Sequence, residues 1–245
     1  MYFVLDYCSG GDLSLHLIDK GKFTEDESRF YCAELILAIE YLHSIDVIYR
    51  DLKPENLLID KTNTLKITDF NVSQIFENEN DLLKDSAGTQ AFLAPEAWSG
   101  FAFRGKAADI WAAGITLYYF AFGKFPFKQK IGQDMKTIIL TKEPEFPEDQ
   151  AVDPRIIELI QACLMKDPAQ RITMDRILTN AWLTDDGTNS IDNSQFKPVS
   201  VTDDEIRQAI TNKLRMTIMV ANKLVRSLNS ARSNLSRTEL SGERT

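Results

Sequence analysis

Short apolar runs separated by turn residues predict a series of brief extended segments in the first part of the chain. Residues 1–5 alternate in the manner of a strand, and the Ser-Gly-Gly-Asp turn at residues 9–12 interrupts it. Residues 47–48, 57–59 and 64–67 are similar apolar pieces, each flanked by polar turn residues. These pieces are too short to build a large sheet, so they predict small β elements around loops.

Longer stretches carry apolar residues at helical spacing. Residues 24–27 form a capping box, which opens a long buried helix ending near His43. We expect the apolar face of this helix to comprise Phe30, Ala33, Leu37 and Tyr41. The strongly apolar residues 106–122 predict a central core helix, which Gly123 ends. Further helices are expected at residues 13–18, 131–141, 153–164 and 173–181, the last opened by a Thr cap.

The last part of the chain differs in composition. Residues 185–197 are polar and predict a linker, and residues 202–205 form a second capping box. Apolar residues then recur at helical spacing among basic ones: Ile206, Ile210, Leu214, Ile218, Ala221, Val225 and Leu228. Such a basic amphipathic helix is typical of a calmodulin target or a membrane-surface segment, and it can also pack on its own domain. All three interpretations stay open.

Composition narrows the class of protein. The chain has 245 residues, 44% of them hydrophobic, which is ample for a globular core, and its net charge of −8 argues against a nucleic-acid partner. Cys8, Cys32 and Cys163 are scattered without metal-ligand spacing, which favours a reducing, cytoplasmic setting. No signal peptide or transmembrane segment is predicted. His16 and His43 lack a neighbouring nucleophile, so we interpret both as structural.

Residues 48–58 form an unusual charged loop between two apolar runs. Pro54 fixes its own φ and steers Lys53 away from the helical region, so the backbone is stiff where polar side chains gather. Asp51, Lys53 and Asn56 lie within six residues of one another, and a second acidic turn follows at Asp69.

This set of residue types fits phosphoryl transfer, in which a protein mainly positions groups and neutralises charge. Asp51 can orient a hydroxyl and accept its proton, and Lys53 can meet the transferred phosphate. Asn56 and Asp69 offer the hard oxygen ligands that Mg²⁺ prefers. The alternative is that Asp51, Asn56 and Asp69 are ordinary turn formers.

Three motifs in order resemble those of eukaryotic protein kinases. Tyr49-Arg50-Asp51, followed by Asn56, resembles the catalytic loop; Asp69-Phe70-Asn71 resembles the magnesium-binding turn; and Ala94-Pro95-Glu96 resembles the end of the activation segment. The resemblance implies an α+β, protein-kinase-like fold with a mainly α-helical large lobe, a short hinge strand, and small β pieces at the catalytic and magnesium loops. It also implies an ATP-dependent Ser/Thr protein kinase.

Individual residues acquire roles through this resemblance. Thr89 would brace Asp51 and Lys53, a combination that favours Ser/Thr over Tyr substrates. Asp109 would tie down the backbone of the catalytic loop, and His43 would brace it. The nucleotide would be held by residues of the hinge and its surroundings, namely Leu5, Asp6, Cys8, Asp12 and Leu58.

Two charged pairs are implied as well. Arg171 matches the arginine that pairs with Glu96 in kinases. Asp85 stands four residues before Thr89, where many kinases carry an activating phosphothreonine, so its carboxylate is expected to pair with Arg50 and to replace part of a phosphate's charge. The alternative is a solvated acid in a mobile loop.

Residues 91–96, 105–118 and 201–206 look like those of calcium/calmodulin-dependent protein kinase kinases. This likeness implies a protein substrate that is itself a kinase, phosphorylated on its activation-loop threonine, and regulation by Ca²⁺-bound calmodulin. It divides the chain into a kinase domain at residues 1–183, a linker at 184–200 and a regulatory tail at 201–245.

Some features depart from the kinase pattern. Tyr49 stands where the catalytic loop usually has His, and Asn71 replaces a Gly, although Asn tolerates a positive φ. Met1 falls in what would be the fifth strand of the small lobe, so the printed sequence holds no Gly-rich loop and no strand lysine. We therefore expect weak ATP binding by these residues alone. The alternative function is a catalytically inactive homologue that acts as a regulatory module binding calmodulin or substrate.

Overall fold

The computed structural model describes residues 5–77, 80–129, 132–147, 152–188 and 191. The chain divides into two units, Met1–Phe196 and Lys197–Thr245, and every described residue belongs to the first. The strand predicted at residues 1–5 lies outside the described residues except for Leu5, which belongs to no strand. The second capping box and the basic amphipathic helix lie wholly outside the described residues.

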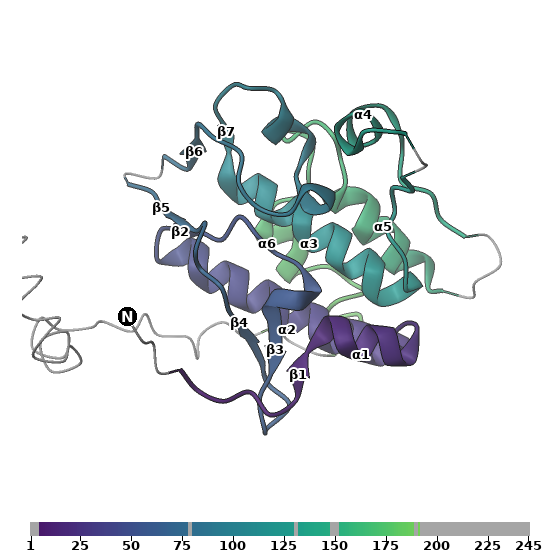
Figure 1. The fold of residues 1–245 in the computed structure, drawn as a ribbon. Coiled ribbons are helices and arrows are strands. Elements are labelled where there is room, and N and C mark those ends of the chain that lie inside the picture. The colour runs from purple at the N-terminus through teal and green to yellow at the C-terminus, as the bar shows by residue number, and fades with distance from the viewer. Residues whose placement is uncertain (1–4, 78–79, 130–131, 148–151, 189–190, 192–245) are drawn as a thin grey trace, which may run out of the picture. The chain divides into compact units, whose positions relative to one another are not determined.

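Helices are the largest elements of the described unit, and short strands lie beside them, in agreement with the predicted α+β class (Figure 1). Their bounds are α1 Leu13–Lys20, α2 Glu25–Ser44, α3 Gly105–Phe122, α4 Met135–Thr141, α5 Pro154–Cys163 and α6 Met174–Leu178. Helix α3 packs against both α2 and α5, and most of its side chains are buried. It is the central core helix that the apolar run predicts.

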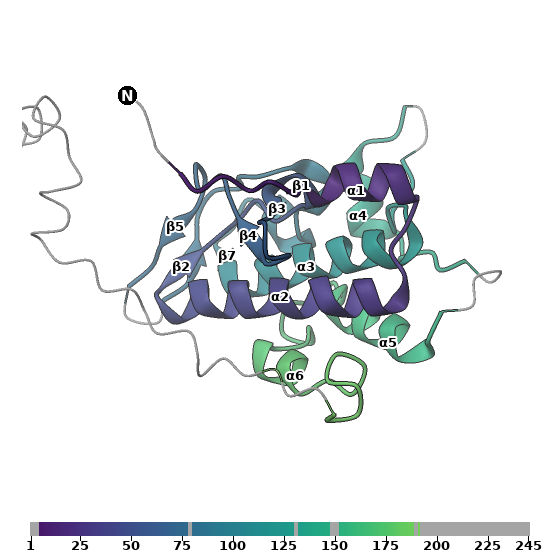
Figure 2. The same ribbon diagram turned by 90° about the horizontal axis from the view of Figure 1, so that it is seen from below.

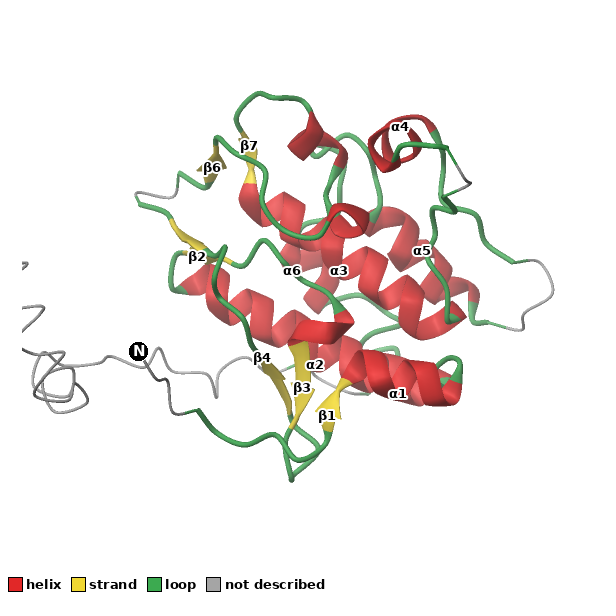
Figure 3. Ribbon diagram, viewed as in Figure 1, coloured by secondary structure: helices red, strands yellow, loops and turns green. Residues whose placement is uncertain are grey.

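The strands are short and lie around loops (Figure 3). β1 (Gly11–Asp12), β3 (Leu57–Ile59) and β4 (Leu65–Ile67) form an antiparallel sheet in the order β1-β3-β4. β2 (Val47–Ile48) pairs with β5 (Gln74–Ile75), and β6 (Leu82–Leu83) pairs with β7 (Phe103–Arg104). Three 3₁₀ turns complete the elements: η1 Pro54–Asn56, η2 Gln90–Phe92 and η3 Pro95–Trp98.

Helix α2 connects the sheet to the rest of the core. It contacts β4 and α6, and Figure 2 shows it running between them. The predicted capping box is present: Thr24 Oγ1 accepts a hydrogen bond from Glu27 N, and the Glu27 carboxylate accepts one from Thr24 N. Among the described residues, no helix is long and apolar enough to cross a bilayer.

Two helix details differ from the sequence prediction. The buried face of α2 centres on Cys32, Leu35 and Ile39, whereas the predicted Phe30 is exposed and Ala33, Leu37 and Tyr41 are only partly buried. Two neighbouring stripes of this helix carry apolar residues. Packing against α3 buries the stripe of Cys32, Leu35 and Ile39 in place of the predicted one.

Helix α4 starts later than predicted. Asp134 accepts hydrogen bonds from Lys136 N and Thr137 N, so it caps the helix and Met135 is the first helical residue. At α6, Thr173 occupies the N-cap position without a side-chain hydrogen bond, and this helix ends at Leu178.

Gly123 ends α3 for a reason beyond helix termination. Its φ is +64°, and a Cβ atom there would lie 2.0 Å from the carbonyl oxygen of Gly21. Only glycine allows this approach. The turn after α1 therefore packs directly on the end of α3.

Candidate active site

The loop after β2 has the stiff backbone that its sequence predicts. Lys53 is extended, with φ −163° and ψ 158°, and Pro54 opens the 3₁₀ turn η1. Arg50 has a φ of +74°, which is uncommon for a residue with a side chain. Such backbone strain concentrates at functional sites and persists where the surroundings hold it.

Asp109 supplies that hold. Its carboxylate is buried and accepts hydrogen bonds from Tyr49 N at 3.0 Å and Arg50 N at 2.9 Å. The third partner is His43, whose Nε2 lies 2.8 Å from Oδ2 of Asp109. Asp109 of helix α3 thus fixes the loop backbone at Tyr49 and Arg50, directly before Asp51. This is the role that the resemblance implies for Asp109, and His43 contacts the same carboxylate.

Tyr49 further ties the loop to the chain around Asp69. The Tyr49 hydroxyl donates to the carbonyl oxygen of Thr68, and Ser73 Oγ donates to the carbonyl oxygen of Tyr49 at 3.1 Å. Burial raises the pKa of Tyr49, with the amide of Asn56 acting against it, so the phenol stays protonated and remains a donor. Tyr49, which stands where the catalytic loop usually has His, therefore links this loop to the chain on both sides of Asp69.

Asp51 is the centre of a polar cluster. Its Oδ1 accepts hydrogen bonds from Thr89 N at 2.8 Å and Thr89 Oγ1 at 2.7 Å, and its Oδ2 accepts one from Lys53 Nζ at 2.9 Å. Lys53 Nζ also donates to Thr89 Oγ1 at 2.7 Å. The structure therefore brings the three predicted catalytic residues into one triangle.

The environment keeps the Asp51 carboxylate ionised. Burial raises its pKa, but the hydrogen bonds from Lys53 and Thr89, together with the Lys53 charge, outweigh burial and bring the pKa below its usual value of 3.8. Asp51 is thus a weak but permanently charged base near neutral pH. Such a group orients a hydroxyl better than it removes a proton from one.

Asn56 and Asp69 are the predicted metal ligands. Asn56 Nδ2 donates to the Asp51 carbonyl oxygen at 2.9 Å and to Asp51 Oδ2 at 3.1 Å, which leaves Oδ1 as the atom of the amide that can meet a cation. Thr68 N donates to the Asn56 carbonyl oxygen at 3.0 Å. The loop that carries Asn56 and the turn that carries Asp69 are therefore neighbours.

The donor set fits a hard divalent cation. Asp69 is exposed, and its Oδ1 accepts one long hydrogen bond, from Asn71 N at 3.4 Å. An amide oxygen and a carboxylate suit Mg²⁺, which usually keeps waters and substrate phosphates as its other ligands. Within the described ranges, no group of three His, Cys, Asp or Glu side chains could hold a metal. The positive φ of this turn, +60°, lies at Asp69, and Asn71 does not adopt one.

Two of the predicted nucleotide residues lie on paired strands, and the other three precede them in the chain. Leu5 and Asp6 are exposed in the loop before β1, and Cys8 is partly buried. Asp12 stands opposite Leu58 in the register of β1 and β3, so the structure brings these two together. Asp12 Oδ1 also caps α1, because it accepts a hydrogen bond from Leu15 N at 3.0 Å.

Arg50 joins the catalytic loop to the activation segment. Its Nη2 donates to Asp85 Oδ2 at 3.0 Å and to the Asp85 carbonyl oxygen at 2.7 Å, which is the predicted pair. Its Nη1 donates to Gln74 Oε1 at 3.1 Å. Gln74 was not predicted, and nothing in its sequence surroundings indicates that a strand would bring it here.

Gly88 permits the close approach of the same segment. Its φ is +107°, and a Cβ atom at this position would lie 2.3 Å from the carbonyl oxygen of Arg50. A side chain here would push Thr89 away from Asp51. The sequence shows a glycine directly before Thr89, but a single sequence cannot show that Gly88 approaches the backbone of Arg50.

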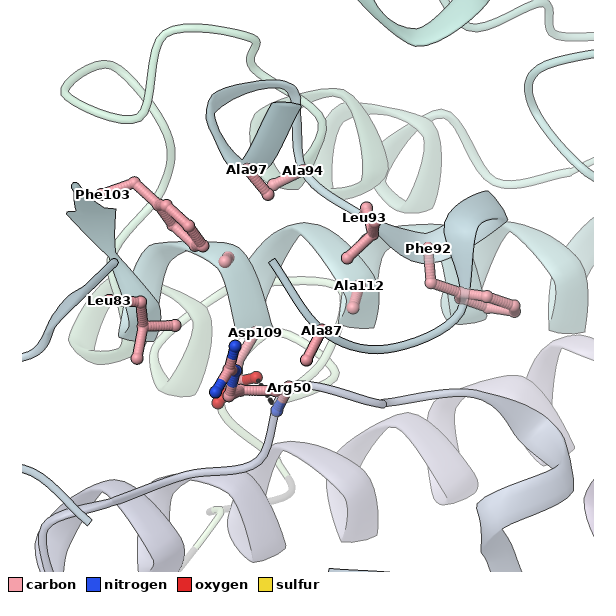
Figure 4. A pocket seen from close by; sticks show the side chains of 11 residues that line it. Arg50, Leu83, Ala87, Phe92, Leu93, Ala94, Ala97, Phe103, Asp109 and Ala112 are labelled. Atoms are coloured by element: carbon pink, nitrogen blue, oxygen red, sulfur yellow. Dashed lines mark hydrogen bonds between the residues drawn. The ribbon is translucent and has the colours of Figure 1, made fainter. Parts of the chain in front are cut away.

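A small cavity lies between this segment and α3 (Figure 4). Its lining is mainly apolar, including Phe92, Leu93 and Phe103, with Arg50 and Asp109 at one end. These two polar residues are already bonded to each other, since Arg50 N donates to Asp109 Oδ1. We interpret the cavity as a packing void, because many of the side chains that line it are small alanines.

Glu96 and Arg171 form the second predicted pair. Arg171 Nη1 lies 2.6 Å from Glu96 Oε1, and Nη2 lies 2.9 Å from Oε2. Arg171 also donates to the carbonyl oxygens of Ala107 and Met165, and its guanidinium lies over the Trp111 ring. This buried bidentate pair fixes the end of the activation segment to the core.

Comparison with known proteins agrees with this geometry. The family model described as "Protein kinase domain" matches residues 1–183. The chain is 41% identical over 170 residues to rat RAC-beta serine/threonine-protein kinase, covering 69% of this chain and 35% of the relative. It is 38% identical over 190 residues to Arabidopsis thaliana serine/threonine-protein kinase GRIK1, covering 77% and 48%. The chain thus spans about a third to a half of the length of these relatives. It belongs to the protein kinase domain family.

Proposed function

We propose that the protein transfers the terminal phosphoryl group of ATP to a serine or threonine hydroxyl of a protein substrate. The observation that carries this proposal is the triangle of Asp51, Lys53 and Thr89, with both Asp51 oxygens and the Lys53 ammonium engaged. Membership of the protein kinase family and the serine/threonine kinase relatives support it.

In this proposal the residues divide the work of an in-line transfer. Asp51 orients the attacking hydroxyl, whose oxygen bonds to the terminal phosphorus as the bond to ADP breaks and ADP leaves, and Asp51 accepts the hydroxyl proton late in this step. Lys53 lies 2.9 Å from Asp51 and offsets charge on the moving phosphoryl group. Because the backbone is fixed through Asp109, little reorganisation is needed when substrate binds.

Asn56 and Asp69 would hold Mg²⁺ together with the phosphates of ATP. The cation supplies charge neutralisation on those phosphates. Leu5, Asp6, Cys8, Asp12 and Leu58 would contact the adenine and ribose, a role supported by the pairing of Asp12 opposite Leu58.

The preference for serine and threonine follows from Thr89. Its hydroxyl connects Asp51 and Lys53, and this combination resembles that of Ser/Thr kinases. The test is transfer of labelled phosphate from ATP by the full-length protein to peptides that differ only in carrying Ser, Thr or Tyr. We expect Ser and Thr peptides to be labelled in the presence of Mg²⁺ and the Tyr peptide to remain unlabelled. Peptide binding without transfer would overturn the proposal and favour the inactive regulatory homologue.

We further propose that the protein acts in calcium/calmodulin signalling on the activation-loop threonine of another kinase, in the cytoplasm. This finer assignment is supported by the likeness of residues 91–96, 105–118 and 201–206 to that kinase group and by the basic tail. A gel shift of a peptide spanning residues 202–237 with calmodulin, present only with Ca²⁺, is the expected result. Absence of a shift would remove calmodulin from the proposal.

A further inference from the structure

A second pocket lies beyond the catalytic triangle, between the segment at Ala91 and the chain that follows α3. Phe125, Phe127 and Met135 contribute apolar surface to it, and Lys124 and Lys128 also line it. It is mainly apolar and open to solvent, as a site for a side chain of a partner must be.

Aromatic packing fixes the apolar floor. The Phe125 ring stacks on Tyr119 of α3, with centroids 5.0 Å apart, and meets Phe92 of η2 edge-on at 5.5 Å. The Phe127 ring stacks on Trp111 at 5.8 Å. Phe125 nevertheless stays 37% exposed, so a rigid apolar surface faces the solvent.

Phe92 links the pocket to the catalytic cluster. Thr89, which donates to Asp51, accepts a hydrogen bond from Phe92 N at 2.9 Å through its carbonyl oxygen. Phe92 in turn contacts Phe125. Only Phe92 stands between Thr89 of the catalytic cluster and Phe125 of the pocket, so the two sites are near enough for one peptide substrate to be tested against both.

Two of the residues that line the pocket, Lys124 and Lys128, are basic, although the chain carries a net charge of −8. Among the described residues that line it, none is acidic. Within the described part of the chain, no carboxylate forms an ion pair with Lys124, and Lys128 pairs with Glu145 at 3.0 Å, where both side chains are exposed. An exposed pair of this kind contributes little free energy, so an incoming carboxylate can compete for Lys128.

We propose that this pocket selects protein substrates in which an apolar side chain stands next to an aspartate or glutamate, close to the phosphorylated residue. The apolar side chain packs on Phe125 and Met135, and the carboxylate meets Lys124 and Lys128. The inference rests on the proposed kinase function, because it assigns the specificity of the same substrate path.

Peptide binding by the full-length protein without ATP tests the inference separately from catalysis. The probe is a short fluorescein-labelled peptide with a central Thr and a Leu-Asp pair on each side, and its twin carries Asn in place of each Asp. We expect the wild-type protein to bind the Asp peptide about five-fold more tightly than the Asn twin, as one or two exposed charge pairs give. Added salt should reduce the difference, because exposed charges are screened.

Lys124→Glu is the informative variant, and Lys61→Glu, in the exposed turn between β3 and β4, is its matched control. Lys124→Glu should abolish the preference for the Asp peptide and leave the affinity for the Asn twin unchanged, whereas Lys61→Glu should change neither. Equal affinities in the wild type, a preference that survives in Lys124→Glu, or no measurable binding of either peptide would overturn the inference. A protein that shows the preference but transfers no phosphate would refute only the kinase proposal.

Discussion

Two arginine–carboxylate pairs hold the activation segment, and they differ sharply in burial. In the Arg171–Glu96 pair the side chains are 1% and 10% exposed and meet through two short contacts. In the Arg50–Asp85 pair Arg50 is 8% exposed, but Asp85 is 69% exposed. The Arg171–Glu96 pair is therefore buried as a whole. In the other pair a buried Arg50 contacts a solvent-exposed Asp85.

This difference in burial makes the Arg171–Glu96 pair a structural one, whereas the acid of the Arg50–Asp85 pair can be replaced. Removing one partner of the buried pair strands a charge that water cannot solvate. Asp85 can be exchanged for another anion at little cost in stability, so its position suits control of Arg50, which precedes Asp51 and whose backbone N–H donates to Asp109.

Breaking the buried pair should have the largest effect on stability. Arg171→Ala leaves Glu96 buried without its partner, so the free energy of unfolding should fall by about 3 to 5 kcal/mol. Urea denaturation of the full-length protein measures the change. The double variant Arg171→Met with Glu96→Leu, which removes both charges, should recover much of the loss. Additive losses in the double variant would show that packing alone explains the effect.

Gly88→Ala tests the backbone between the two pairs. Its added Cβ atom would meet the Arg50 carbonyl oxygen at 2.3 Å in a φ of +107°, so we expect a loss of about 1 to 3 kcal/mol together with impaired phosphoryl transfer. Gly100→Ala is the control, since a Cβ atom there meets nothing within 4 Å at a similarly positive φ of +77°. Equal losses in the two variants would show that conformational strain, and not the approach to Arg50, is responsible.

Asp85→Ala should change stability by less than about 1 kcal/mol, because the carboxylate is exposed. Turnover should nevertheless fall, since Arg50 loses the anion that orients it. The measurement is the phosphorylation rate of protein that carries no phosphate on its activation segment, with Asp85→Glu as the charge-preserving control. Unchanged turnover in Asp85→Ala would contradict a phosphate-like role for Asp85.

The smallest expected effect is the pH dependence contributed by Asp51. Its pKa in the folded protein lies below 3.8, so its hydrogen bonds stabilise the fold above the pKa of the unfolded chain. This contribution is lost as the pH falls through the folded pKa. The difference in unfolding free energy between wild type and Asp51→Asn should therefore stay constant from pH 7 to pH 5 and shrink below pH 4. A difference that grows on acidification would contradict the direction of the shift.

Local chemistry explains what the sequence could predict. The capping box at Thr24, the extended Lys53 before Pro54 and the helix end at Gly123 depend on neighbouring residues, and all three are confirmed. The pairs Arg171–Glu96 and Asp109 with the catalytic loop connect distant residues, and only the resemblance to kinases pointed to them.

Long-range packing explains what the sequence missed. The buried stripe of α2 was misplaced, because Phe30 and Cys32 lie on different apolar stripes and only contact with α3 decides between them. The contacts of Gln74 with Arg50 and of Phe92 with Phe125 likewise join separate elements. No periodicity in a single chain reports such pairings.

The central claim is that Asp51 acts on the hydroxyl that receives the phosphoryl group. Steady-state kinetics of the full-length protein with a Thr peptide, comparing wild type, Asp51→Asn and the surface control Asp19→Asn, tests it most directly. We expect a kcat about 10²- to 10⁴-fold lower in Asp51→Asn, with peptide KM and folding retained and the control unaffected. A kcat in Asp51→Asn equal to that of the wild type would contradict it.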